Sequence, residues 1–139
     1  MNRISRTLTG LAFVFAPLTA PAQSLEEAQA IEGVIRDQIA AIQQDDWATA
    51  FAYASPMIQG IFQNPETFSR MVTKGYPMVW RPKSFRSGEI ADGPDGYVQT
   101  MLFEDLQGRL FVADYFMKLI DGAWRINGVQ IRPAEEQSV

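Results

Sequence analysis

Apolar residues recur at helical spacing in the part of the chain that follows residue 23. Between residues 25 and 43 the apolar positions lie about one helical turn apart, with mostly polar residues between them; they are Ala28, Ile31, Ile35, Ile39 and Ile42. This pattern predicts an amphipathic helix of about five turns with one buried face. Ser24 and Glu27 have the spacing of a capping box, which predicts that the helix begins directly after Ser24.

Shorter helical segments are predicted between residues 45 and 75. Asp45-Asp46 is expected to end the first helix and to cap a second, which Ser55-Pro56 interrupts because proline disfavours helix at the residue before it. Residues 57–62 predict another turn of helix. Asn64-Pro65-Glu66 is a helix start, with a capping side chain, a proline for the first turn and an acid that the helix dipole favours. The prolines at 77 and 82 predict an irregular connection.

From residue 83 onward the pattern changes to the alternation of β-strands. Strands are predicted at 84–90, 97–104, 110–120 and 123–132, joined by a loop at 92–96, a turn at 106–109 and a tight turn at Asp121-Gly122. Asp-Gly between alternating segments is typical of a two-residue hairpin. Helices followed by an antiparallel meander predict the α+β fold class, with N-terminal helices packed on an antiparallel sheet.

The two faces of the strand at 110–120 differ in charge. One face is uncharged and is expected to point towards the helices; it carries Phe111, Ala113, Tyr115, Met117 and Leu119. The other carries Asp114 and Lys118 and is expected to point outward. In the last strand Trp124 and Ile126 are expected to point inward and Asn127 outward. The outward face of 110–120 also favours a homodimer formed through the sheet, because it holds four large apolar residues, Leu110, Val112, Phe116 and Ile120.

Residues 1–22 have the organisation of a secretory signal peptide. Arg3 and Arg6 make its start positive, an apolar segment follows, and Ala20 and Ala22 are the small residues that signal peptidase recognises. The apolar run is about half as long as a bilayer-spanning helix. We therefore expect cleavage after Ala22, one domain at 23–139, and a bacterial periplasmic or secreted location with no stable membrane anchor.

The composition narrows the chemistry of this domain. The chain has no cysteine and no histidine, which excludes disulfides, thiolate nucleophiles and an imidazole base or metal ligand. It has 16 acidic and 12 basic residues, and two of the basic ones lie in the leader, so the mature domain is acidic and nucleic-acid binding is not expected. The sequence has no phosphate-binding glycine loop and no zinc-type ligand cluster, and we expect neither metal nor cofactor.

The order of the motifs resembles a known superfamily. The long helix is followed by Asp46-Trp47, Ala50-Phe51 and Ala54-Ser55-Pro56, then by the helix start at Asn64-Pro65, and the chain ends in a meander that closes on Asp-Gly-Ala-Trp-Arg-Ile-Asn-Gly-Val at 121–129. These motifs resemble the nuclear transport factor two-like superfamily and, within it, the exported proteobacterial family of domain of unknown function 4864, over nearly all of residues 25–133. The resemblance implies a cone-shaped α+β fold, in which a curved sheet wraps around helices. It implies no single activity, because the superfamily includes isomerases, dehydratases, cyclases, ligand binders and assembly domains.

Two sets of residues are candidates for a functional site. Side chains expected on the inner face or near the helices are candidates for lining a ligand pocket; they are Tyr115, Met117, Trp124, Phe51, Phe68 and Trp80. Asp114 and Tyr115 are candidates for catalysis, because ketosteroid-isomerase-like members of the superfamily use a carboxylate base with phenol donors in the cone. The strand phase places Asp114 and Tyr115 on opposite faces, so we assign no catalytic residue.

Three functions are left open by the sequence. It favours a non-catalytic module that binds a small apolar or amphipathic molecule or associates with a second copy of itself. The alternative is a ketosteroid-isomerase-like isomerase or dehydratase that uses a carboxylate and a tyrosine in the cone. An apolar cavity with few polar groups would indicate a binder, a filled cone an interaction module, and an inward carboxylate beside a phenol an enzyme.

Overall fold

The computed structural model describes residues 10–12 and 24–134 of the 139-residue chain. The predicted signal peptide, residues 1–22, lies outside the described residues apart from its short central stretch, so its cleavage stays a prediction. Within the described part of the chain, none of the helices is long and apolar enough to cross a membrane.

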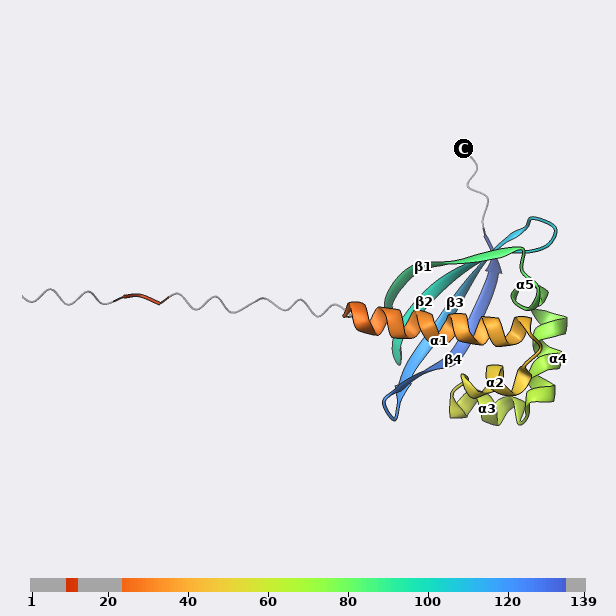
Figure 1. Ribbon diagram of the computed structural model, residues 1–139, viewed down its shortest axis with the longest axis horizontal. Helices are drawn as coiled ribbons and strands as arrows, with labels where there is room; N and C mark the ends of the chain where they lie inside the picture. Colours follow the sequence, from red (N-terminus) through yellow and green to blue (C-terminus); the bar gives the residue numbers. More distant parts are fainter. Residues whose placement is uncertain (1–9, 13–23, 135–139) are drawn as a thin grey trace, which may run out of the picture.

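The first helix, α1 (Leu25–Gln43), begins where the capping box predicts. The hydroxyl of Ser24 accepts a hydrogen bond from the backbone N–H of Glu27 at 3.1 Å. Its apolar stripe is buried, with Ile31, Ile35 and Ile39 fully covered. In Figure 1 the helix lies across the curved sheet, so this stripe supplies one side of the core.

Four short helices follow and gather at one end of α1 (Figure 1): α2 (Trp47–Ala52), α3 (Pro56–Phe62), α4 (Pro65–Gly75) and α5 (Pro77–Trp80). Three of them begin at a capping side chain that accepts a hydrogen bond from the backbone N–H three residues ahead; these caps are Asp46, Ser55 and Asn64. Helix α5 corrects the prediction of an irregular connection. Pro77 stands at its first position, where the ring favours helical φ and the missing N–H is not needed.

The four strands form one antiparallel sheet in the order β1-β2-β3-β4. They are β1 (Ser84–Gly93), β2 (Gly96–Glu104), β3 (Leu110–Ile120) and β4 (Ala123–Pro133). The predicted α+β class is thereby confirmed. The predicted loop at 92–96 is wrong in extent, because β1 continues to Gly93 and only two residues separate it from β2. A side chain at position 96 would place its Cβ 2.7 Å from the Met117 carbonyl oxygen, so glycine permits this close pairing.

The inward and outward faces of β3 follow the predicted alternation over most of the strand. Ala113, Tyr115 and Met117 are buried in the core. Leu119 was expected inward but is 53% exposed, because it lies at the end of the strand beside the hairpin. That hairpin is the predicted two-residue turn, with φ of 50° at Asp121 and 78° at Gly122, as a type I′ turn requires.

A β-bulge in β4 changes which of its residues face the core. Ile126 pairs with Met117 and Gly128 pairs with Phe116, which leaves Asn127 as the extra residue. Simple alternation from Ile126 would turn residues 129 and 131 outward. The bulge instead sets Val129 opposite Tyr115 and Ile131 opposite Ala113, on the inner face.

Candidate functional site

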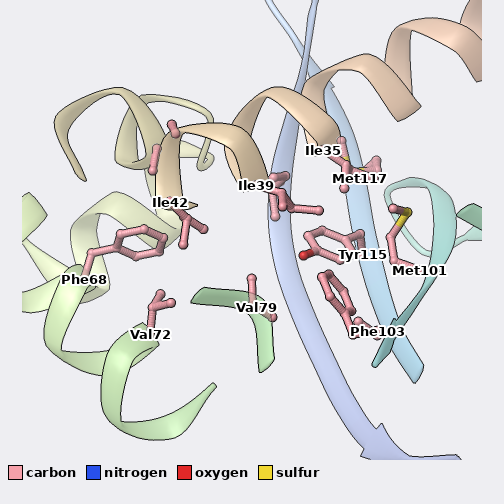
Figure 2. Close-up of a cluster of buried hydrophobic side chains, with 14 of the residues drawn as sticks. Ile35, Ile39, Ile42, Phe68, Val72, Val79, Met101, Phe103, Tyr115 and Met117 are labelled. Carbon is pink, nitrogen blue, oxygen red and sulfur yellow. The ribbon is translucent and has the colours of Figure 1, made fainter. Parts of the chain in front are cut away.

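A cavity of about 260 Å³ lies between the inner face of β3 and β4 and the helices α1, α3, α4 and α5. Its deep wall is formed by buried side chains that Figure 2 shows together: Ile42, Phe68, Val72, Val79 and Tyr115. Its rim is formed by half-buried side chains: Ile58, Phe62, Met71, Val129 and Ile131. The cavity is therefore deep at α1 and β3 and opens towards α3, α4 and the edge strand.

The α4 wall is held in place by aromatic packing around Phe68. Asn64 and Pro65 set the start of α4, and Phe68 and Val72 lie one turn apart on its buried face. The ring of Phe68 lies 5.7 Å from Phe51, 6.0 Å from Phe62 and 6.3 Å from Trp47, centroid to centroid; these rings belong to α2 and α3. Edge-to-face and tilted contacts of this kind fix the position of the Phe68 ring beside the cavity.

The β4 side is held by a polar connection at the bulge. The backbone N–H of Ile126 donates to the carbonyl of Tyr53, and that of Ser55 donates to the carbonyl of Ile126. The Ser55 hydroxyl donates to Asn127 Oδ1 at 2.7 Å, and Asn127 Nδ2 donates to Asp95 Oδ2 at 3.2 Å. The extra residue of the bulge thus ties the edge strand to the α2–α3 corner, next to the cavity.

Two buried polar groups face this otherwise apolar space. Tyr115 is 1% exposed and Gln38 is 5% exposed. Among the described residues, none hydrogen-bonds to the Tyr115 hydroxyl, and Gln38 makes one bond, from Nε2 to the carbonyl of Ala50 at 3.2 Å. No side-chain nitrogen or oxygen sealed from solvent in the described region lacks a partner. The Tyr115 hydroxyl and Gln38 Oε1 are therefore reached from the cavity that both residues line.

The electrostatics of the cavity are neutral. Among the described residues, the only lining side chain besides Gln38 and Tyr115 with an oxygen or nitrogen atom is that of Tyr76, and none of the lining side chains is acidic or basic. Burial raises the pKa of the Tyr115 hydroxyl. This tyrosine is therefore protonated at neutral pH and offers a hydrogen-bond donor. Within the described residues, no group of three or more acidic side chains is placed to hold a metal ion.

The structure places the six predicted ligand-binding residues in different surroundings. Tyr115 and Phe68 line the cavity. Phe51 lies behind Phe68, and Met117 is buried further along β3. Neither remaining tryptophan lines the cavity: Trp124 packs on Tyr97, and Trp80 donates from Nε1 to Asp45 Oδ1.

Asp114 lies on the outer face of the sheet, away from Tyr115. Its carboxylate accepts a hydrogen bond from the Thr100 hydroxyl at 3.0 Å and forms an ion pair with Arg132. Thr100 is its cross-strand neighbour on β2. The arrangement does not bring a carboxylate and a phenol together inside the cone.

The comparisons with known proteins agree with this architecture. The sequence profile described as "Domain of unknown function (DUF4864)" matches residues 24–139. The chain belongs to this family. None of the curated proteins compared with it matches.

A solved structure shows the same fold. It is the crystal structure of an NTF2-like protein of unknown function from Shewanella baltica OS155, which superposes with a TM-score of 0.54 at 13% sequence identity. The match covers 83% of this chain and 99% of that one. The NTF2-like fold, which the sequence motifs resemble, is thereby confirmed.

Several cavity residues escaped the sequence argument. Gln38 lies between Ile35 and Ile39 on the buried face of α1, and a polar residue among isoleucines is the signal that could have identified it. Val129 and Ile131 were missed because the bulge reverses their direction. The signal for the bulge is Asn127-Gly128 inside a strand, followed by apolar residues in the opposite phase.

Proposed function

We propose that the domain binds a small apolar or amphipathic molecule in this cavity without converting it. The observation that carries the proposal is the Tyr115 hydroxyl, a buried polar group that lines an apolar cavity and has no partner among the described residues. This hydroxyl is reached from the cavity, so a ligand oxygen that enters can accept a hydrogen bond from it in apolar surroundings. The volume, about 260 Å³, is close to the lower end of small-molecule sites.

The lining favours binding over turnover. An isomerase or dehydratase needs a group that takes and returns a proton near neutral pH. The lining contributed by residues 24–134 includes no carboxylate or amine, and burial moves the pKa of Tyr115 further from neutrality. Asp114, the carboxylate that the ketosteroid-isomerase comparison suggests, is held on the opposite face by Thr100 and Arg132.

Native mass spectrometry of the protein isolated gently after expression from the full chain tests this proposal. We expect a species that starts at Gln23, which would also support the proposed signal peptide and export, and that carries a non-covalent small-molecule adduct. Val72→Phe adds a ring to the deep wall and should remove the adduct while the circular dichroism spectrum is unchanged. Leu106→Phe, on an exposed loop, is the matched control. An adduct that persists in Val72→Phe would contradict binding in this cavity.

A second candidate is self-association through the outer face of the sheet. There the register sets Val98 beside Phe116 and Leu102 beside Val112, two apolar pairs with Thr100 and Asp114 between them. The central charges of this face, on Asp114 and Arg132, neutralise each other, which lowers the cost of covering it. Because a two-fold dimer uses the same patch on both copies, this apolar patch favours a second copy as its partner.

Sedimentation velocity over a range of concentrations tests self-association. We expect a dimer that Leu102→Glu converts to a monomer, whereas Leu106→Glu on the exposed loop does not. A wild-type protein that stays monomeric at every concentration would contradict it.

A further inference from the structure

The side-chain amide of Gln38 already makes one hydrogen bond inside the protein. Its Nε2 donates to the carbonyl of Ala50, and this bond fixes the orientation of the amide. Of the two amide atoms, Oε1 is the one without a partner among the described residues, and it only accepts hydrogen bonds. Any ligand atom that satisfies it must carry a hydrogen.

Tyr115 has the complementary capacity. Its hydroxyl is protonated and free among the described residues, so it donates to an oxygen that enters the cavity. In Figure 2 this hydroxyl points to the side on which Ile42, Val72 and Val79 lie, which are also cavity residues. One buried donor and one buried acceptor therefore line the same apolar space.

We propose that the cavity selects a neutral molecule with an apolar body and a hydroxyl group, which accepts from Tyr115 and donates to Gln38 Oε1. This deepens the binding function proposed above and rests on it. A hydroxyl is the small group that donates and accepts at one atom. A ketone or ester accepts from Tyr115 but offers no hydrogen to Gln38 Oε1, so it forms one hydrogen bond fewer than a hydroxyl does.

Charged ligands fit this lining poorly. The part of the lining that the structure describes has no lysine or arginine to pair with a carboxylate and no acid to pair with an ammonium group. Burying an uncompensated charge is far more costly than burying a neutral hydroxyl. The lining thus discriminates by charge as well as by hydrogen-bond direction.

Four probes with one carbon ring test the preference: cyclohexanol, cyclohexanone, cyclohexanecarboxylate and methylcyclohexane. The mature protein, residues 23–139, is titrated with each, and dissociation constants are measured from NMR shifts of the cavity methyl groups. We expect cyclohexanol to bind about fivefold or more tightly than cyclohexanone, with the carboxylate weakest, as one satisfied hydrogen bond predicts.

Variants separate the two polar contacts. Gln38→Met keeps the length of the side chain without Oε1 and should bring cyclohexanol and cyclohexanone to equal affinity. Tyr115→Phe should weaken both probes while cyclohexanol stays preferred. Gln59→Met is the matched control, because the Gln59 amide also donates to backbone carbonyls, of Phe51 and Ala54, but does not line the cavity. It should leave the ratio of the two affinities unchanged.

The outcomes distinguish this inference from the proposed function. If no probe binds, the binding function itself fails. If the probes bind but cyclohexanone or the carboxylate binds as tightly as cyclohexanol, the hydroxyl preference is overturned and the binding function stands. A ratio that survives Gln38→Met overturns the role of Gln38.

Discussion

The two halves of the inner face of one sheet are covered in different ways. Beneath the middle of α1 the space is filled: Ile35 on α1, Met101 on β2 and Met117 on β3 are at most 1% exposed. Towards β3 and β4, short helices meet at corners, and a cavity of about 260 Å³ remains. Both halves are apolar, so the difference arises from the length and packing of the covering elements.

The largest expected effect is on the free energy of unfolding, when the same isoleucine-to-alanine change is made in each half. Ile35→Ala in the filled half should lower the free energy of unfolding by about 2–5 kcal/mol, because a full side chain is removed from a close-packed core. Ile58→Ala on the cavity rim should cost clearly less, because this half-buried side chain makes fewer contacts. Urea denaturation measures both. Equal losses would contradict the distinction between a filled and a hollow half.

The next largest expected effect on stability concerns Ser55, at the α2–α3 corner beside the cavity. Ser55 is 1% exposed, caps α3 and donates to Asn127. Ser55→Ala should cost about 1–2 kcal/mol, since it removes a cap and leaves a polar partner short of a hydrogen bond. The same change at the exposed cap of α1, Ser24→Ala, is the comparison and should cost less. If Ser24→Ala proves the more harmful, the bulge connection does not stabilise the corner.

A smaller effect of opposite sign is expected for Tyr115→Phe. Without ligand, removing a buried hydroxyl that has no partner in the described structure should leave stability unchanged or raise it by up to about 1 kcal/mol. Thermal unfolding of the ligand-free protein measures this. A marked loss of stability would mean that the hydroxyl has a partner within the protein and is not available to a ligand.

The smallest expected effect is a pH dependence of stability that arises from Glu32, on helix α1 in the filled half. The hydrogen bond from the Ser87 hydroxyl, and then that from Arg36, hold the pKa of Glu32 below its ordinary value of 4.5. Ionised Glu32 therefore stabilises the fold fully above pH 4.5, and this contribution is lost as the pH falls through the lowered folded value.

Glu32→Gln should flatten the decline of stability in that acid range. Asp37→Asn, on the exposed side of the same helix, should leave the decline as it is. The contribution is small, because Glu32 is partly exposed and solvent screens the interaction. An unchanged slope in Glu32→Gln would show that the link between α1 and β1 does not depend on charge.

The sequence predicts well those features of the fold that residues close together in the chain determine. The caps at Ser24 and Asn64, the proline at 65 and the Asp121-Gly122 turn act within one turn of chain, and each is found where it is predicted. The inward phase of β3 follows from its own alternation. These local signals were sufficient for the α+β class.

The candidate site was less predictable because contacts between distant segments create it. The bulge residue Asn127 accepts a hydrogen bond from Ser55, which is far away in the sequence, and the bulge turns Val129 and Ile131 towards the cavity. The donor and acceptor roles of Gln38 depend on Ala50 in another helix. Inward strand phase identified Tyr115, and aromatic character near the helices identified Phe68, but the same two criteria also selected Trp124 and Trp80, which pack elsewhere.

The shortness of helix α3 affects how quickly its amide hydrogens exchange with solvent and how quickly a ligand could leave the cavity. It has seven residues and no buried side chain; Ile58 and Phe62 face the cavity while Met57 and Ile61 are 56% and 63% exposed. A helix this short is not stable on its own, so we expect its amide hydrogens to exchange early by local unfolding. Because Ile58 and Phe62 belong to the cavity rim, we expect each opening of α3 to uncover that rim and, if the cavity holds a ligand as proposed, to set an upper limit on how long the ligand stays.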